Sequence, residues 1–213
     1  MREVITQALY GYWNEIRAGR LAPKRFEIEP SLIAGILPDT FILERVDNDT
    51  SRFRLAGTRV CETFGAEFRG ENFIDLVGPE DRVTLKRQLS VIARQGATGV
   101  FMLSCETATG KTIDIEMLLL PLMHMGETVD RMLGSMAVSN RQSWTGHEPI
   151  TKTRIVEHRL VWPDGRPHAM IDNTHRQAPF LPQMNEARII RGGRRQFRVY
   201  DGGLTQTDDD RQS

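Results

Sequence analysis

The side chains best suited to chemistry in this sequence lie in three separate places. Asp114 and Glu116 alternate along a stretch of β-strand character, which puts both carboxylates on one face of the strand. Two neighbouring carboxyl groups can share acid and base roles in catalysis. Because Ile113, Ile115 and Met117 form the other face, we interpret the two acids as the water-facing side of a half-buried sheet.

The cysteines and histidines show no metal-binding or catalytic spacing. Cys61 and Cys105 stand far apart and form no Cys-x-x-Cys pair, so we expect reduced thiols. All five histidines lie at position 124 or later. The sequence also lacks Gly-x-Ser-x-Gly, His-Glu-x-x-His, Gly-x-Gly-x-x-Gly and P-loop motifs. We therefore predict that the protein is not an enzyme, has no catalytic residue and binds no metal.

Arginines near the C-terminus are the third candidate. The cluster that could contact an anion or a partner consists of Arg191, Arg194, Arg195 and Arg198. Guanidinium groups bind phosphates as forks, so nucleotide or nucleic-acid binding is one interpretation. A solvated strand and a partner-docking segment are the others. Because 28 basic residues balance 28 acidic ones, overall charge favours neither nucleic acid nor an anionic membrane.

An amphipathic helix is predicted over residues 3–17. Its apolar stripe includes Leu9, Tyr12, Trp13 and Ile16, at the spacing of one helical face. That face must be buried somewhere. Two alternatives stay open, because the helix could cover its own sheet or contact a second copy or another partner.

Strands and helices alternate in a simple order after the N-terminal helix. Strands are predicted at 40–49 and 52–57, short helices at 58–65 and 73–77, a longer helix at 79–95, and three further strands at 98–108, 112–123 and 131–140. Pro79 fits the first position of the longer helix, Glu80 and Asp81 complement its dipole, and Gly96 stops it. This order predicts an α+β fold with an antiparallel sheet of about five strands.

The stretch FRLAGTRVCETFGAEFRGENFIDLVGPEDR (53–82) resembles the central signature of PAS domains, and residues 9–44 resemble small bacterial stand-alone PAS proteins. The resemblance implies a curved five-stranded antiparallel sheet with short helices and one longer helix on one face. We expect an N-terminal helix and connection at 1–36, the PAS domain at 37–142, and a partly irregular or disordered C-terminal extension at 143–213.

PAS domains often enclose a small-molecule cavity, and the resemblance assigns apolar residues to that place. The candidate lining residues are Phe53, Leu55, Phe64, Phe73, Leu89, Phe101, Leu103, Ile115, Met117 and Met136. Either these side chains fill the core by themselves, or they leave a pocket for a small apolar ligand.

Two PAS cofactors are disfavoured. Flavin photosensors of the LOV subtype carry a reactive cysteine where this chain has Phe73. Haem-binding PAS sensors use a histidine on the long helix, and residues 79–95 contain none. His124 falls within the PAS part, where a solvent-facing turn is expected.

The sequence thus predicts a non-enzymatic PAS signalling or adaptor protein that acts through protein–protein contacts. The alternative is a sensor in which an apolar ligand or cofactor is the signal. The partners expected are a kinase, a regulator, a polar-localisation factor or a second copy in a dimer. No signal-peptide pattern is visible, and the longest apolar run, 117–123, is too short to span a bilayer, so we expect a cytoplasmic protein.

Overall fold

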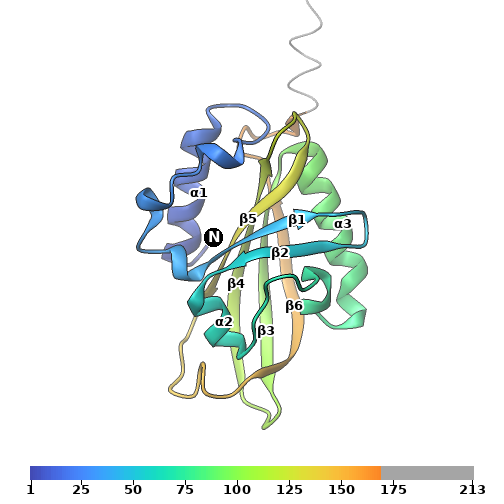
Figure 1. The fold of residues 1–213 in the computed structure, drawn as a ribbon. Coiled ribbons are helices and arrows are strands. Elements are labelled where there is room, and N and C mark those ends of the chain that lie inside the picture. The colour runs from blue at the N-terminus through green and yellow to red at the C-terminus, as the bar shows by residue number, and fades with distance from the viewer. Residues whose placement is uncertain (169–213) are drawn as a thin grey trace, which may run out of the picture. The chain divides into compact units, whose positions relative to one another are not determined.

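The computed structural model describes residues 1–168, which build one open six-stranded sheet with helices on both faces (Figure 1). The α-helices are α1 (Val4–Arg17), α2 (Thr58–Phe64) and α3 (Pro79–Gln95). The strands are β1 (Thr40–Arg45), β2 (Ser51–Ala56), β3 (Thr98–Thr107), β4 (Thr112–Met123), β5 (Val129–Val138) and β6 (Ile150–Val161). Short 3-10 helices lie at Arg25–Glu27, Pro30–Ile33, Leu37–Asp39 and Phe73–Leu76. None of the helices within residues 1–168 is both long and apolar enough to cross a membrane.

The strands follow the order β2-β1-β5-β4-β3-β6, and each neighbouring pair is antiparallel. The α+β class and all five predicted strands are therefore confirmed. The β1–β2, β3–β4 and β4–β5 pairs bring sequence neighbours together, whereas the β1–β5 and β3–β6 pairs join strands that are not consecutive.

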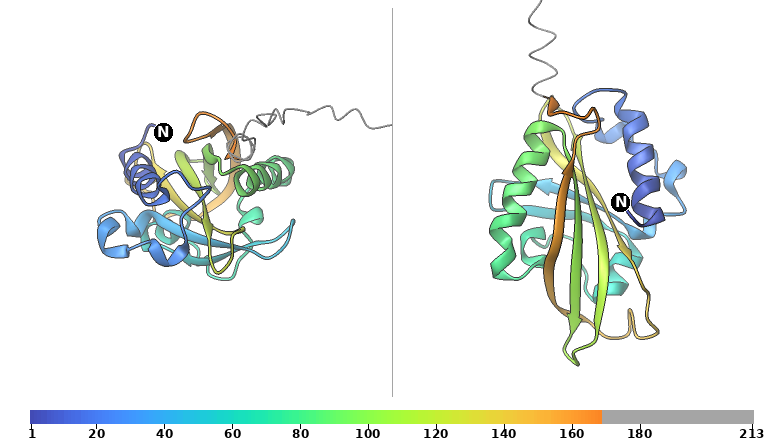
Figure 2. Two further views of the ribbon diagram at one scale, coloured as in Figure 1. Left: turned by 90° about the horizontal axis from the view of Figure 1, so that it is seen from above. Right: turned by 180° about the vertical axis from the view of Figure 1, so that it is seen from behind.

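Both faces of the sheet are covered at its centre, along β4. On one face, Ile113, Ile115 and Met117 of β4 join residues of α2 and α3 in what we call the inner core. On the other face, Leu118 and Leu120 of β4 lie beneath α1 in the outer core. Figure 2 shows α1 and α3 on opposite sides of the strands when the sheet is viewed from above. Because side chains alternate between faces, a strand covered on both sides becomes a continuous apolar run, which explains residues 117–123.

Helix α3 begins and ends where its sequence predicts. Pro79 is its first residue, and Gly96 follows its end with φ of 64°, a left-handed conformation that glycine adopts without strain. The apolar stripe of Leu85, Leu89 and Ile92 is buried in the inner core. The local signals and the packing therefore agree along this helix.

Strand β6 differs from the sequence-based expectation, which places residues 143–213 in a partly irregular extension. Most β6 side chains are exposed at the sheet edge, and bulges interrupt its alternation, so its periodicity is weak. The start of α3 holds the strand in place. Asp81 accepts a hydrogen bond from the Ile155 amide at 2.7 Å, and the Gly78 amide donates to the Thr153 carbonyl at 2.9 Å.

A β-bulge corrects the prediction that Leu55 lines the inner core. Leu43 pairs with Phe53, but Ile42 pairs with Leu55, so Arg54 is the extra residue on β2. The bulge turns Leu55 toward the opposite face, where its side chain is 45% exposed. Strict alternation would have placed it beside Phe53.

Gly134 provides a test of this packing. It pairs with Phe41 across β5 and β1, and a Cβ at position 134 would overlap the Phe41 ring. We expect Gly134→Ala to lower the free energy of unfolding by about 1–3 kcal/mol, as overpacking does, in urea denaturation. Gly11→Ala is the matched control, because a Cβ on α1 at this position meets open space and alanine favours a helix by about 1 kcal/mol. An unchanged midpoint for Gly134→Ala would contradict the β1–β5 packing.

Candidate functional site

The candidate cavity residues lie together, and with the exception of Leu55 they are buried. The nine side chains that contribute to the inner core are Phe53, Phe64, Phe73, Leu89, Phe101, Leu103, Ile115, Met117 and Met136, each at most 5% exposed. They come from β2, α2, the 3-10 helix at Phe73–Leu76, α3, β3, β4 and β5. The sequence-based grouping is therefore reproduced by the fold, whereas a ligand-binding role stays a prediction.

Phenylalanine rings fill the centre of the inner core. The Phe73 ring stacks on Phe41 at a centroid distance of 5.8 Å and meets Phe53 edge-on at 5.5 Å. Phe53 in turn stacks on Phe68 at 4.8 Å. Phe73 is fully buried and offers no thiol at the position where LOV photosensors carry one. The residue at this position therefore cannot form the cysteine–flavin adduct of the LOV type.

His124 lies in the exposed turn that follows β4, as predicted. Its backbone amide donates to the Asp130 side chain at 2.9 Å, which fixes the turn. Within residues 1–168 no group of three or more His, Cys, Asp or Glu side chains is arranged to hold a metal ion.

One surface groove within residues 1–168 is lined by charges that have partners. The groove between the start of α3 and β6 has a volume of about 480 Å³. Its ion pairs are Arg82–Asp75 at 3.1 Å, Lys152–Glu106 at 3.6 Å and Arg154–Glu80 at 3.5 Å. These pairs connect α3, β3 and β6, so the groove is a seam between elements rather than a prepared anion site.

Helix α1 and the sheet face beneath it form the best-defined candidate site. Leu9 and Trp13 are fully buried in the outer core, and the Trp13 indole N–H donates to the Pro121 carbonyl at 2.9 Å. Tyr12 and Ile16 are half-buried at the margin. Of the two alternatives left open by the sequence, the structure shows the helix covering its own sheet.

Glu116 anchors the beginning of α1, which corrects its assignment to a solvated face. Asp114 is exposed as expected, but Glu116 is only 1% exposed because α1 covers this part of β4. Its carboxylate accepts hydrogen bonds from the Arg2 amide at 2.7 Å, the Glu3 amide at 3.0 Å and the Thr6 hydroxyl. Glu116, a residue of β4, thus accepts the hydrogen bonds that a capping side chain usually accepts at the start of a helix.

The start of α1 needs this carboxylate because the helix provides no cap of its own. The N-cap residue is Glu3, whose side chain makes no capping hydrogen bond. Free amides at a helix N-terminus attract negative charge. Burial alone raises the pKa of Glu116, but the hydrogen bonds from Thr6, Glu3 and Arg2 outweigh it and keep the pKa below its ordinary value of 4.5.

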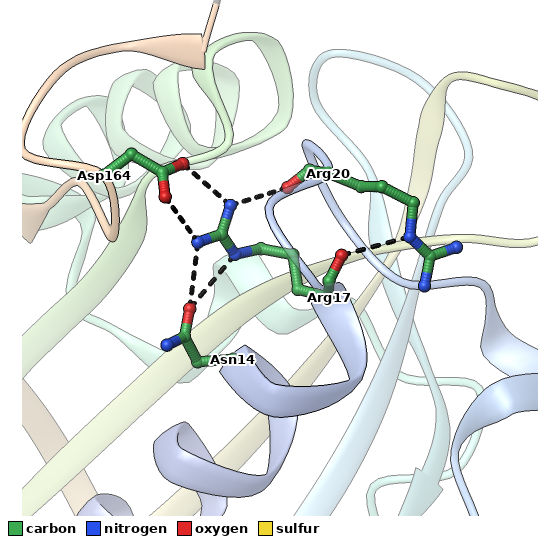
Figure 3. A network of polar contacts seen from close by, with 4 residues as sticks. All are labelled: Asn14, Arg17, Arg20 and Asp164. Atoms are coloured by element: carbon green, nitrogen blue, oxygen red, sulfur yellow. Dashed lines mark hydrogen bonds and ion pairs between the residues drawn. The ribbon is translucent and has the colours of Figure 1, made fainter.

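Arg17 anchors the other end of α1 (Figure 3). Its side chain is buried, and its N–H groups donate to both Asp164 carboxylate oxygens at 2.8 Å, to Asn14 Oδ1 at 3.0 and 3.1 Å and to the Arg20 carbonyl at 2.7 Å. These five bonds use all five guanidinium N–H groups. The hydrogen bonds from Arg17 lower the pKa of Asp164.

The chain turns sharply between α1 and the rest of the fold. Ala18 has φ of 48° and Gly19 has φ of 79°, so two successive residues are left-handed. The Arg20 side chain donates to the Arg17 carbonyl at 3.0 Å and the Ile16 carbonyl at 2.8 Å, which satisfies the helix end. We call residues 18–20 the hinge.

Sequence reasoning missed the polar anchors of α1, although a weak signal for two of them exists. Thr6 and Arg17 extend the apolar stripe of Leu9 and Trp13 at steps of three and four residues. Polar residues in a buried stripe need partners. The partners, Glu116 and Asp164, lie more than 100 residues away, at positions that no local pattern marks.

Comparison with known proteins identifies the family. A family model described as a PAS domain matches residues 1–137, more than half of the chain. The chain belongs to the PAS domain family. PAS domains are signalling and sensory modules that commonly contact other signalling proteins and typically lack catalytic activity. No curated protein matches the sequence significantly.

Solved structures with a similar fold include several light-oxygen-voltage proteins. A LOV protein of Rhodobacter sphaeroides is 16% identical, with a TM-score of 0.40 over 49% of this chain and 61% of that chain. A light-oxygen-voltage domain studied with a flavin analogue is 17% identical, with a TM-score of 0.40 over 69% and 96%. An RNA-binding light-oxygen-voltage receptor is 16% identical, with a TM-score of 0.38 over 59% and 36%. This chain thus spans about six-tenths of the length of the first of these proteins.

Truncating Phe73 distinguishes a filled core from a ligand pocket. Because the PAS core here is packed around this ring, we expect Phe73→Ala to cost about 3–5 kcal/mol in the free energy of unfolding. Phe26→Ala is the control, since Phe26 is 74% exposed and should change stability by less than about 0.5 kcal/mol. Equal, small effects in urea denaturation would show that the space around Phe73 is loosely filled.

Glu116→Gln tests the helix anchor. Charged hydrogen bonds stabilise more than neutral ones, so we expect a loss of about 1–3 kcal/mol and faster hydrogen exchange at the start of α1. The contribution of a carboxyl group with a lowered pKa is complete above its ordinary value of 4.5 and disappears as pH falls through the lower folded-state pKa. Wild-type stability should therefore converge on that of Glu116→Gln in acid. Glu106→Gln, at a more exposed ion pair, should show neither effect.

Proposed function

We propose that this PAS protein is a non-enzymatic cytoplasmic signalling adaptor, and that α1 with the sheet face beneath it is the surface that switches. The partner would be a kinase, a regulator, a polar-localisation factor or a second copy. Residues Arg191, Arg194, Arg195 and Arg198, candidates for a further partner or anion contact, lie outside the described residues.

The observation that carries this proposal is the composition of the covered face. The sheet residues beneath α1, which we call the outer patch, are Val100, Leu118, Leu120, Leu122 and Leu133, each at most 5% exposed. Proteins rarely leave a contiguous apolar surface of this kind open to water. If α1 detached, the outer patch would need a new cover, and a partner could supply it.

The attachment of α1 is suited to a reversible change. Its contacts with carboxylates lie at its two ends, at Glu116 and Asp164. Between them, the Trp13 indole donates to the Pro121 carbonyl, and apolar contact rests mainly on Leu9 and Trp13. A minor detached state requires an energy gap of only a few kcal/mol. A partner that binds a state populated in roughly 1% of molecules loses about a hundredfold in apparent affinity, so modest changes in docking would change binding strongly.

A ligand-responsive sensor is the second candidate, and the methionines of the inner core favour it. Met117 pairs with Met136 on neighbouring strands, and Met132 lies on the same face. Methionine side chains adapt their shape readily, so a small apolar ligand could enter by repacking them. Native mass spectrometry and an absorbance spectrum of the purified protein distinguish the two candidates. A stoichiometric bound ligand would favour the sensor, whereas its absence from repeated preparations would favour the adaptor.

Site-specific photo-crosslinking in the native cell tests the adaptor proposal. Met102 is half-buried on the outer face of β3, beside Val100 of the outer patch. A diazirine amino acid at position 102 should give a defined protein adduct. The matched control is position 83, where Val83 is 76% exposed on α3 on the other side of the sheet.

Loosening α1 should increase the adduct at position 102. We expect Leu9→Ala, which removes apolar contact from the outer core, to raise the yield several-fold by populating the detached state. The mass of the adduct distinguishes a second copy from another protein. Crosslinking from position 83 alone, or an unchanged yield with Leu9→Ala, would show that partners do not use the outer patch.

A further inference from the structure

Arg17 joins the end of α1 and the adjacent hinge to a segment that is distant in the sequence. Asn14 belongs to α1, the Arg20 carbonyl belongs to the hinge, and Asp164 follows β6 (Figure 3). The Arg17 guanidinium also lies over the Trp13 ring, 5.7 Å from its centroid. Arg17 therefore contacts both Asp164, which neutralises its charge, and Trp13, which is buried in the outer core.

Asp164 sits in a tight turn at the exit of β6. Trp162, Pro163, Asp164 and Gly165 form it, and the Gly165 amide donates to the Trp162 carbonyl at 2.9 Å. Pro-Asp-Gly is a typical turn sequence, because proline presets the second position and glycine tolerates the last. From this turn the chain continues into residues 169–213.

The two anchors of α1 differ in how firmly they are held. Glu116 lies in the middle of β4, which pairs with strands on both sides. Asp164 lies beyond the end of β6, an edge strand. A displacement that reaches the sheet from the C-terminal side would therefore move Asp164 before it moved Glu116.

Withdrawing Asp164 would leave Arg17 buried without its counter-charge. Such a cation is strongly unfavourable in a protein interior, so the side chain would move to water. Arg17 is the last residue of α1, and the next residue, Ala18, is held in a left-handed conformation that alanine seldom adopts. Release of the helix end would allow Ala18 to leave this conformation, so the hinge does not oppose the movement.

We propose that the Arg17–Asp164 pair is a latch through which the chain after β6 controls the docking of α1. With the 162–165 turn in place, Asp164 holds the end of α1 on the sheet. When the turn is displaced, Arg17 leaves, Trp13 loses its neighbour, and the outer patch opens from that end. The latch supplies an input to the switching surface of the proposed function, and in that respect it rests on that proposal.

Hydrogen exchange of the full-length chain tests the latch without any partner. Asp164→Asn keeps the shape of the side chain and removes its charge. We expect exchange in residues 10–17 to rise about tenfold, while exchange in β4 and α3 stays at the wild-type level. Glu80→Gln is the matched control, since it removes the carboxylate of the exposed Arg154–Glu80 pair and should leave α1 unchanged.

A double-mutant cycle tests whether the turn acts through the carboxylate. Pro163→Gly should loosen the turn and raise exchange in residues 10–17 by a smaller factor than Asp164→Asn. In the Asp164→Asn background the same change should add nothing, because the latch is already open. Additive effects of the two substitutions, or exchange that rises equally in β4, would overturn the latch and indicate a merely structural turn.

The outcomes also separate the latch from the proposed function. Faster exchange of α1 in Asp164→Asn with no change in the crosslink at position 102 would support the latch and refute the adaptor surface. If the crosslink responds to Leu9→Ala but Asp164→Asn causes no α1-specific rise in exchange, the adaptor surface is supported and the latch is refuted.

Discussion

From Met117 to Met123, strand β4 is apolar on both faces, and this requirement for cover on two sides organises the PAS domain. Its inner face is buried by α2 and α3, together with a stack of phenylalanine rings. Its outer face is buried by α1. The inner cover is part of the same chain of short helices that links β2 to β3. The outer cover is followed by the hinge at residues 18–20, which is why we propose that it is the part of the fold that switches.

Electrostatics at the ends of α1 complement this division. The helix carries no cap of its own at its start, and Glu116 of the sheet supplies the negative charge. At the end of α1, the buried guanidinium of Arg17 is neutralised by Asp164, which is distant in the sequence. Apolar burial thus gives α1 its affinity for the sheet, whereas two carboxylates determine where it sits. The signalling role that we propose for this surface uses that arrangement, because a charge can be withdrawn more readily than an apolar face can be replaced.

Local physics explains which parts of the fold could be predicted. Helix α3 has its proline start, acidic first turn, apolar stripe and glycine stop within one continuous segment, and the structure reproduces each of them. The five predicted strands are likewise visible as alternating or continuously apolar stretches. Strand β6 is missing from the prediction because its side chains are largely exposed and because Asp81 of α3 helps to hold it in place. The prediction that Leu55 lines the inner core is wrong because the bulge on β2 inserts one extra residue, which moves Leu55 to the opposite face.

The sequence by itself determined the α+β class, the resemblance to PAS domains, the apolar inner core and the replacement of the LOV cysteine by Phe73. These properties depend on residue type and on spacings of a few positions. Only the tertiary structure decided that α1 covers its own sheet, that Glu116 is buried, and that Arg17 meets Asp164. Each of these depends on contacts between residues more than 100 positions apart. A carboxylate next to a distant helix end looks the same in the sequence as one that faces water, and the packing of the elements alone distinguishes them.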